Sequence, residues 1–230
     1  MVIGNGMIAK SFNKYVADQN VLIFASGVSN SGSQQPTDYE REELLLRKSV
    51  EVHPEKTVVY FSTCSIYDPS LQTSIYVQHK LKMEHVLKGS ASSYIIFRVS
   101  NPVGFTDNQH TVLNYFAKHI KEQEAFTVWQ NAGRNLLDIE HVFLLCDHII
   151  QSGAHKSSIV NIANPKNYPV TEIIKAIEKY FCVKGNYSLA QKGNSPLIDT
   201  AVIQPLFHLL GIKFNDHYLE ALLQKYFPLS

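Results

Sequence analysis

The stretch Met1-Val-Ile-Gly-Asn-Gly-Met-Ile-Ala9 predicts a short strand, a tight glycine turn and the start of a helix. Gly4, Gly6 and Ala9 match the pattern GxGxxA, whose glycines let backbone N–H groups approach a pyrophosphate closely. The helix that follows would present its positive end to the phosphates. A tight turn that binds no ligand could contain the same two glycines. The position between a strand and a helix favours dinucleotide binding.

Beyond this stretch, apolar runs of strand length alternate with longer segments of helical spacing. The helix after the glycine turn is expected to reach about residue 17. This alternation predicts an α/β fold of βαβ units with a parallel sheet, which binds ligands at the carboxyl ends of its strands. Strands are expected at 21–25, 57–62, 94–98, 126–129 and 159–162, and further helices at 39–52, 76–87, 111–123, 139–152, 170–181 and 217–227.

Composition excludes several classes of protein. The chain has 230 residues, of which 45% are apolar and 18% charged, which is typical of a globular protein. A formal net charge of +1 gives no reason to expect nucleic acid or an anionic membrane as partner. Cys64, Cys146 and Cys182 form no CxxC pair, so neither disulfides nor a metal site is expected. Without a signal peptide or membrane-spanning run, the protein is expected to be cytoplasmic.

A second pattern predicts acid–base chemistry. Thr63 lies at the end of the strand 57–62, and Tyr76 and Lys80 follow on a helix. Their i, i+4 spacing places the phenol and the ammonium on one helical face. An ammonium stabilises a neighbouring phenolate and so lowers the pKa of a phenol from about 10. Tyr76 is therefore a candidate general acid/base for an alcohol or ketone, with Thr63 sharing the hydrogen bond. A solvated helix face could carry the same YxxxK pair by chance.

The order of these motifs resembles that of the extended short-chain dehydrogenases/reductases, the NAD-dependent epimerase/dehydratase proteins that mostly act on nucleotide sugars. GNGMIA (4–9), FSTCSIYD (61–68), YVQHK (76–80) and FRVSNPVG (97–104) carry the resemblance. GRNLLDIEHV (133–142), VNIA (160–163) and LLGI (209–212) extend it along most of the chain. It implies a Rossmann-like NAD(P)-binding part at 1–98 with strand returns near 139–162. A small substrate-binding part would comprise 99–138 and 163–230.

The resemblance assigns roles position by position. Thr63, Tyr76 and Lys80 would be catalytic, and Lys80 would also hold the nicotinamide ribose. The cofactor, NAD or NADP, would contact Gly4, Gly6, Met7, Ile8, Ala9, Ala25, Ser26 and Lys80, and the substrate would contact Ser65, Asn101 and Arg134. A polar turn before Pro102 would explain Asn101 equally well, and Arg134 could instead form an ion pair with Asp138 or Glu140.

The chain departs from the family pattern in three places. The family's second and third strands are missing, because the strand at Val21 follows soon after Ala9. The acidic residue expected about twenty positions after the glycines has no counterpart, so the adenosine half of the site should be shallow. The first strand is short. Only a short loop separates Thr63 from Tyr76, which predicts an open substrate mouth.

These features together predict an NAD(P)-dependent oxidoreductase or epimerase for a nucleotide-linked sugar or a similar carbonyl compound. Cys64 and Ser65 occupy the positions at which the family's dehydratases look like Asp-Glu, and the absence of these two acids disfavours dehydration. The neighbouring Tyr67-Asp68 resembles the dTDP-4-dehydrorhamnose reductase group. The alternative is a non-catalytic or partner-completed scaffold of the same fold. Relatives in the family pair the two helices that correspond to 39–52 and 76–87 across a dimer interface, so the resemblance implies a homodimer. His79 and His85 are expected to face solvent or to pack.

Overall fold

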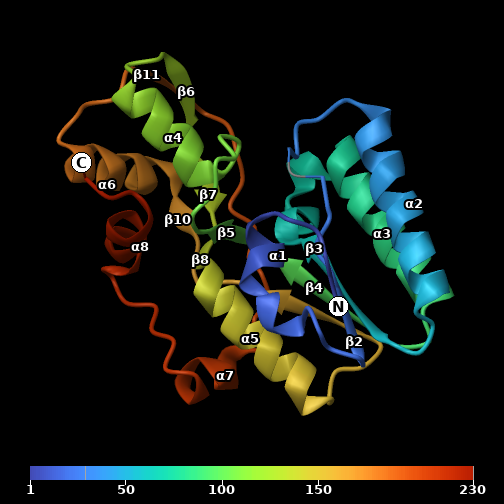
Figure 1. Cartoon of the computed structure of the whole chain (residues 1–230). Coiled ribbons are helices and arrows are strands. Elements are labelled where there is room, and N and C mark those ends of the chain that lie inside the picture. The colour runs from blue at the N-terminus through green and yellow to red at the C-terminus, as the bar shows by residue number, and fades with distance from the viewer. Residues whose placement is uncertain (29, 230) are drawn as a thin grey trace.

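A five-stranded parallel sheet organises the computed structural model, which describes residues 1–28 and 30–229 (Figure 1). The strand order is β1-β2-β3-β4-β9, so β1 and β9 are its edges. In the register, Ile23 pairs with Val2 and Val59, and Ile95 pairs with Val59 and Ser158. The strands are β1 (Val2–Ile3), β2 (Val21–Phe24), β3 (Thr57–Thr63), β4 (Tyr94–Val99) and β9 (Ser158–Ile162).

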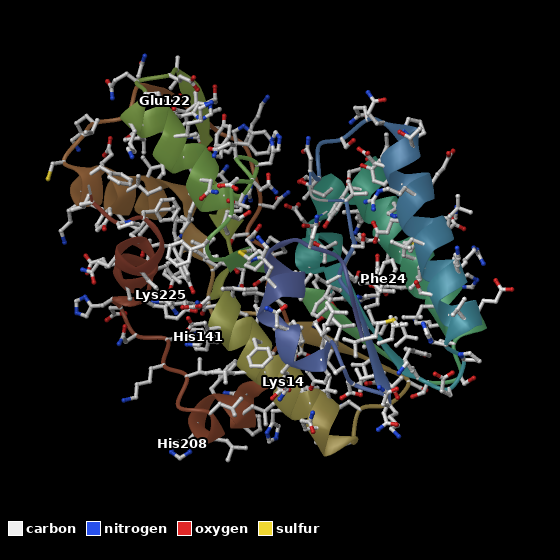
Figure 2. The ribbon with its side chains drawn as sticks, viewed as in Figure 1. Lys14, Phe24, Glu122, His141, His208 and Lys225 are labelled. Carbon is white, nitrogen blue, oxygen red and sulfur yellow. The ribbon has the colours of Figure 1, made fainter. Side chains whose placement is uncertain are left out.

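Helices cover both faces of this sheet (Figure 1). The short α1 (Met7–Ser11) and α5 (Ile139–Ser152) pack on one face, and α2 (Pro36–Val52) and α3 (Ile75–Ser90) pack on the other. Strand side chains alternate between the two layers. Ile23 faces α1 and α5, whereas Phe24 lies in the cluster beneath α2 and α3 (Figure 2).

Local sequence signals explain where the helices begin and end. The Ser74 hydroxyl accepts from the Val77 amide at the start of α3, and Asp138 accepts from the Glu140 amide at the start of α5. Gly153 ends α5 with φ +63°, a left-handed conformation that glycine adopts without strain.

The C-terminal part is made of small two-stranded sheets and four helices. β5 (Asn101–Val103) pairs with β8 (Leu136–Asp138), β7 (Gly133–Arg134) with β10 (Tyr168–Pro169), and β6 (Phe126–Trp129) with β11 (Tyr187–Ala190). The helices are α4 (Val112–Lys121), α6 (Val170–Phe181), α7 (Gln204–Leu209) and α8 (Tyr218–Tyr226). One hydrophobic cluster runs from the sheet through this part without interruption.

The predicted α/β class and parallel sheet are confirmed, with β1 at one edge of the sheet. The helix after the glycine turn is shorter than expected. α1 ends at Ser11, and a 3-10 turn, η1 (Asn13–Tyr15), follows. The Asp18 carboxylate then accepts from the amides of Asn20 and Val21 and turns the chain directly into β2. This turn leaves no room for further strands before β2.

Candidate active site

The carboxyl ends of β1 and β2 meet at the glycine turn. Gly4 has φ +125°, a conformation that disfavours any residue with a Cβ. A Cβ at Gly4 would lie 2.3 Å from the carbonyl oxygen of Ala25. Gly4, Ala25 and Ser26 therefore lie in direct contact.

Gly6 differs from Gly4. A Cβ there would meet no atom within 4 Å, so the backbone faces open space at the start of α1. The first amides of a helix have no acceptor within it and remain available to an anion. Ala9 is buried, and Met7 and Ile8 are half-buried against the core. The turn thus leaves open space at the first amides of α1, a helix of five residues.

Beside this turn the sheet is smaller than the family pattern, on the side where an adenosine would lie. No strand pairs with the outer side of β1 among the described residues, so the sheet does not extend under an adenosine. Arg41, from α2, donates to the Ser26 hydroxyl at 3.2 Å and brings a positive charge to the end of β2.

Thr63 ends β3 and is followed by two 3-10 turns, η2 (Cys64–Tyr67) and η3 (Pro69–Leu71). The Thr63 hydroxyl donates to Ser65 Oγ at 3.0 Å and accepts from the Ser65 amide at 3.1 Å. Burial raises the pKa of the Cys64 thiol to about 12, so this thiol stays protonated at neutral pH. Thr63 and Ser65 therefore supply hydroxyl groups rather than an acid at this strand end.

Tyr76 is half-buried in the first turn of α3, and α3 packs against η2. The Lys80 ammonium lies 5.9 Å from the centroid of the Tyr76 ring. Tyr76 and Lys80 therefore share one face of α3, as their spacing predicts, but the ammonium is directed elsewhere.

The partners of Lys80 lie in the interior. Its Nζ donates to Glu42 Oε1 at 2.9 Å, to the Tyr60 hydroxyl at 3.0 Å and to the Phe61 carbonyl at 3.3 Å. Lys80 is 3% exposed and Glu42 is fully buried. An ammonium has three N–H bonds, so these three acceptors satisfy it completely.

Glu42 is satisfied as fully as Lys80. Its Oε1 also accepts from the Tyr60 hydroxyl at 2.8 Å, and its Oε2 accepts from the Val28 amide at 3.0 Å and lies 3.1 Å from His79 Nε2. Burial by itself would raise the pKa of the Glu42 carboxyl. The charge of Lys80 and hydrogen bonds from His79, Lys80 and Tyr60 outweigh burial and lower this pKa to about 2. Glu42 is thus an anion in the interior.

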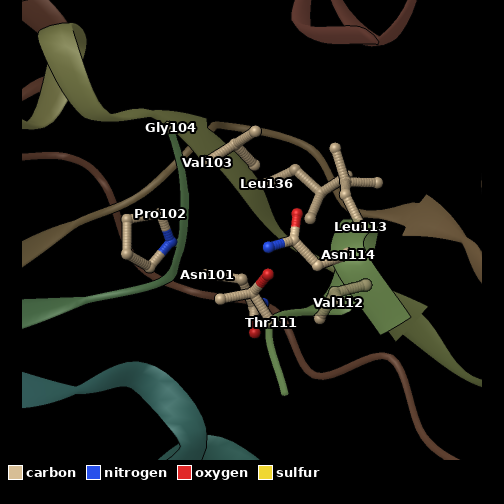
Figure 3. A pocket seen from close by; sticks show the side chains of 9 residues that line it. All are labelled: Asn101, Pro102, Val103, Gly104, Thr111, Val112, Leu113, Asn114 and Leu136. Atoms are coloured by element: carbon tan, nitrogen blue, oxygen red, sulfur yellow. The ribbon is translucent and has the colours of Figure 1, made fainter. Parts of the chain in front are cut away.

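Asn101 lies away from these groups. Its backbone amide and its side-chain amide both donate to the Asn135 carbonyl, at 3.1 and 2.9 Å. Thr111 and Asn114 lie beside it around a cavity of about 10 Å³, which has room for one water molecule (Figure 3). In this arrangement Asn101 joins β5 to the segment before β8.

Arg134 lines a much larger cavity of about 480 Å³ between α4, β6 and β7. Its guanidinium donates a hydrogen bond to the Gly133 carbonyl at 3.0 Å, and no carboxylate of the described residues lies within ion-pair distance of it. Burial lowers the pKa of the Arg134 guanidinium, and the charge of Asp68 opposes this shift. The alternative ion pair with Asp138 or Glu140 is absent among these residues, because Lys225 pairs with both carboxylates. The other lining residues are His110, Val112, Tyr115, Phe116, Thr127, Trp129, Ala132 and Val170.

Sequence reasoning missed two features. Glu42 lies on the buried face of α2, between Tyr39 and Leu46. An acidic residue at helical spacing among apolar ones indicates a buried carboxylate that needs a partner. Trp129 faces the large cavity because β6 alternates buried and exposed residues. The alternation along β6 can be seen in the sequence, but the cavity cannot, because residues of α4 and β7 form its other walls. His79, expected to face solvent or to pack, is buried against Glu42.

Among the described residues, no helix is long and apolar enough to span a membrane, and no group of three acidic, histidine or cysteine side chains could hold a metal ion.

The architecture is that of an α/β nucleotide-binding protein with a parallel sheet and a ligand edge at its carboxyl ends. The chain belongs to the NAD dependent epimerase/dehydratase family, whose model matches residues 8–163. The match begins after Gly6, so it rests on the later motifs rather than on the glycine turn. A search of curated proteins finds no match.

Solved structures show the same fold at low sequence identity. A UDP-Glc/GlcNAc 4-epimerase from Campylobacter jejuni is 14% identical with a TM-score of 0.70, covering 98% of this chain and 82% of that one. The Thermus thermophilus UDP-glucose 4-epimerase in complex with NAD is 14% identical with a TM-score of 0.68, covering 95% and 80%. A UDP-N-acetylglucosamine 4-epimerase from Methanobrevibacter ruminantium, in complex with UDP-N-acetylmuramic acid, is 16% identical with a TM-score of 0.68, covering 97% and 80%.

Proposed function

We propose that this protein is an NAD(P)-dependent epimerase or reductase acting on a nucleotide-linked sugar. The observation that carries the proposal is Arg134, a half-buried guanidinium without a carboxylate partner, in a cavity of about 480 Å³. A planar guanidinium binds a diphosphate through paired hydrogen bonds, and Tyr115, Phe116 and Trp129 offer aromatic surface to a base. Family membership and the nucleotide-sugar epimerases of the same fold agree with this assignment.

The substrate would reach from this cavity toward the end of β3. Asp68, which follows η2, is close enough to Arg134 for its charge to act on the guanidinium. Thr63, Ser65 and Tyr76 belong to the same η2–α3 region. A sugar attached to a diphosphate at Arg134 would thus present a hydroxyl or carbonyl to the phenol of Tyr76.

When bound, the cofactor would accept or donate the hydride. Gly4 to Ala9 would hold its pyrophosphate, with Ala25 and Ser26 alongside. Tyr76 would exchange a proton with the substrate oxygen while Thr63 orients that oxygen through its hydroxyl. Asn101 donates through its side-chain amide to the Asn135 carbonyl, so its side-chain oxygen is the group that would contact a substrate.

A second candidate is a scaffold or partner-completed protein of the same fold. It is favoured by two observations, the ammonium of Lys80 bound to Glu42 and the unextended edge of the sheet at β1. A homodimer also remains a proposal. On α2 and α3, the exposed apolar residues available for such a contact include Leu44, Val52, Ile75 and Leu81, whereas Leu46, Val86 and Leu87 are core residues.

The test is a titration of the purified protein with NADH and with NADPH, followed by nicotinamide fluorescence. We expect saturable binding, lost when Gly6 is replaced by valine, because the new side chain would occupy the open space at the turn, where an added Cβ meets no protein atom within 4 Å. Gly89→Val is the matched control, since a Cβ there also meets nothing within 4 Å. Absence of binding to both cofactors by a folded protein would shift the proposal to the scaffold.

A further inference from the structure

Glu42 and Lys80 form the core of a buried polar cluster between the sheet and the α2–α3 pair. β3 contributes Tyr60, α2 contributes Glu42, and α3 contributes His79 and Lys80. All four side chains are at most 7% exposed. A buried charge pair with this many hydrogen bonds is held in one geometry, because breaking it leaves an unpaired charge in the interior.

The chain after β2 closes the cluster toward the site. The Val28 amide donates to Glu42 Oε2, and a Cβ on Gly27 would lie only 2.9 Å from Lys80 Nζ. Gly27 therefore lies directly on the ammonium, and any larger residue would displace it. Glu42 thus holds both the ammonium and the loop that covers it.

We propose that Glu42 latches Lys80, so that the carboxylate, the loop Ala25–Val28 and the ammonium form a closed arrangement that must open before Lys80 can contact a bound cofactor. The inference rests on the proposed function, and it makes Glu42 a positioning residue that acts through Lys80. A ligand hydroxyl can reach the ammonium only by replacing one of its three acceptors, and Gly27 must move to admit it. The closed population therefore weakens cofactor binding.

Accessibility of Lys80 provides a test that needs no activity. The protein is treated with an acetylating N-hydroxysuccinimide ester, and the rate at each lysine is followed by mass spectrometry. In the native protein we expect Lys80 to react at least a hundredfold more slowly than Lys88, an exposed lysine on the same helix. Glu42→Gln removes the counter-charge and should speed the labelling of Lys80 at least tenfold.

Two further variants sharpen this comparison. Glu43→Gln makes the same chemical change one residue away, at a surface carboxylate that pairs with Arg47 and Lys82, and should leave Lys80 protected. Tyr60→Phe keeps the ring but removes a hydroxyl that contacts both Glu42 and Lys80, and should give an intermediate rate. It serves as the test variant if Glu42→Gln does not fold.

Cofactor affinity gives the second readout. We expect Glu42→Gln to bind NADH or NADPH at least tenfold more tightly than the native protein, and Glu43→Gln to bind it unchanged. Labelling of native Lys80 as fast as Lys88 overturns the latch. Binding by the native protein with no gain in Glu42→Gln also overturns it, and leaves the proposed function intact. If Lys80 is labelled rapidly in Glu42→Gln but no variant binds NADH or NADPH, the proposed function is overturned, and the latch, which rests on it, is overturned as well.

Discussion

Gly4 lies so close to Ala25 that a single added carbon at Gly4 would sit 2.3 Å from the Ala25 carbonyl oxygen. Gly6, two residues later, faces open space. The two glycines of one motif therefore differ in their surroundings: Gly4 permits the packing of β1 against the end of β2, and Gly6 borders open space at the start of α1.

Alanine at each position should distinguish these surroundings. Gly4→Ala is expected to lower the free energy of unfolding by about 2 to 4 kcal/mol, because it combines a collision with a left-handed backbone. Gly6→Ala should change it by less than about 1 kcal/mol. Urea denaturation followed by circular dichroism measures both. Equal losses for the two variants would contradict this division.

Tyr76→Phe is expected to reduce turnover of a nucleotide-sugar substrate about 10²- to 10⁴-fold, the range for loss of a general acid/base. Cofactor binding should change little, since the ring remains. Tyr94→Phe, at the opposite end of the sheet in β4, is the control and should retain full activity. Loss of binding together with turnover would show that Tyr76 has a structural role.

Arg134→Gln is expected to weaken binding of a nucleotide diphosphate sugar about tenfold to a hundredfold, the cost of a charge-assisted hydrogen-bond pair. Arg134→Lys keeps the charge and loses the planar fork, so it should restore only part of the affinity. Calorimetric titration with UDP-sugars measures both. Arg47→Gln, at an exposed pair with Glu43, should bind as the native protein does; a matching loss there would contradict a specific role for Arg134.

Glu42 predicts a pH dependence of stability. The pKa of its carboxyl is lowered from 4.5 to about 2, against the opposing effect of burial, by Lys80 and the hydrogen bonds of the cluster. The unfolded chain binds the proton more readily, so this contribution is complete above pH 4.5 and is lost as the pH falls toward 2. The contribution is about 3 kcal/mol. Glu42→Gln should flatten the stability profile over this window in chemical denaturation, whereas an unchanged slope would contradict the assignment.

Regular elements could be predicted wherever local signals were strong. The predicted helices at 139–152 and 170–181 agree with α5 and α6 to the residue. For α5, Asp138 and Gly153 mark both ends with side-chain and backbone caps. The buried strands β3 and β4 were equally clear, because continuous apolar runs of strand length have few other uses.

Features that depend on distant contacts could not be predicted. β11 pairs with β6 across about sixty residues, and its sequence Tyr-Ser-Leu-Ala carries no distinctive pattern. The i, i+4 spacing places Tyr76 and Lys80 on one helical face, but it says nothing of Glu42 on another helix. The partner of the Lys80 ammonium is therefore visible only in three dimensions.

The larger hydrophobic cluster determines how this molecule can be divided. It includes Phe12 beside the glycine turn and Tyr226 near the end of α8, so the five-stranded sheet and the C-terminal part share one interior. Cutting the chain after residue 163 would strip α6 and α8 from the remaining core, and neither fragment would retain a closed interior. Heat or denaturant should accordingly unfold the protein in one cooperative transition.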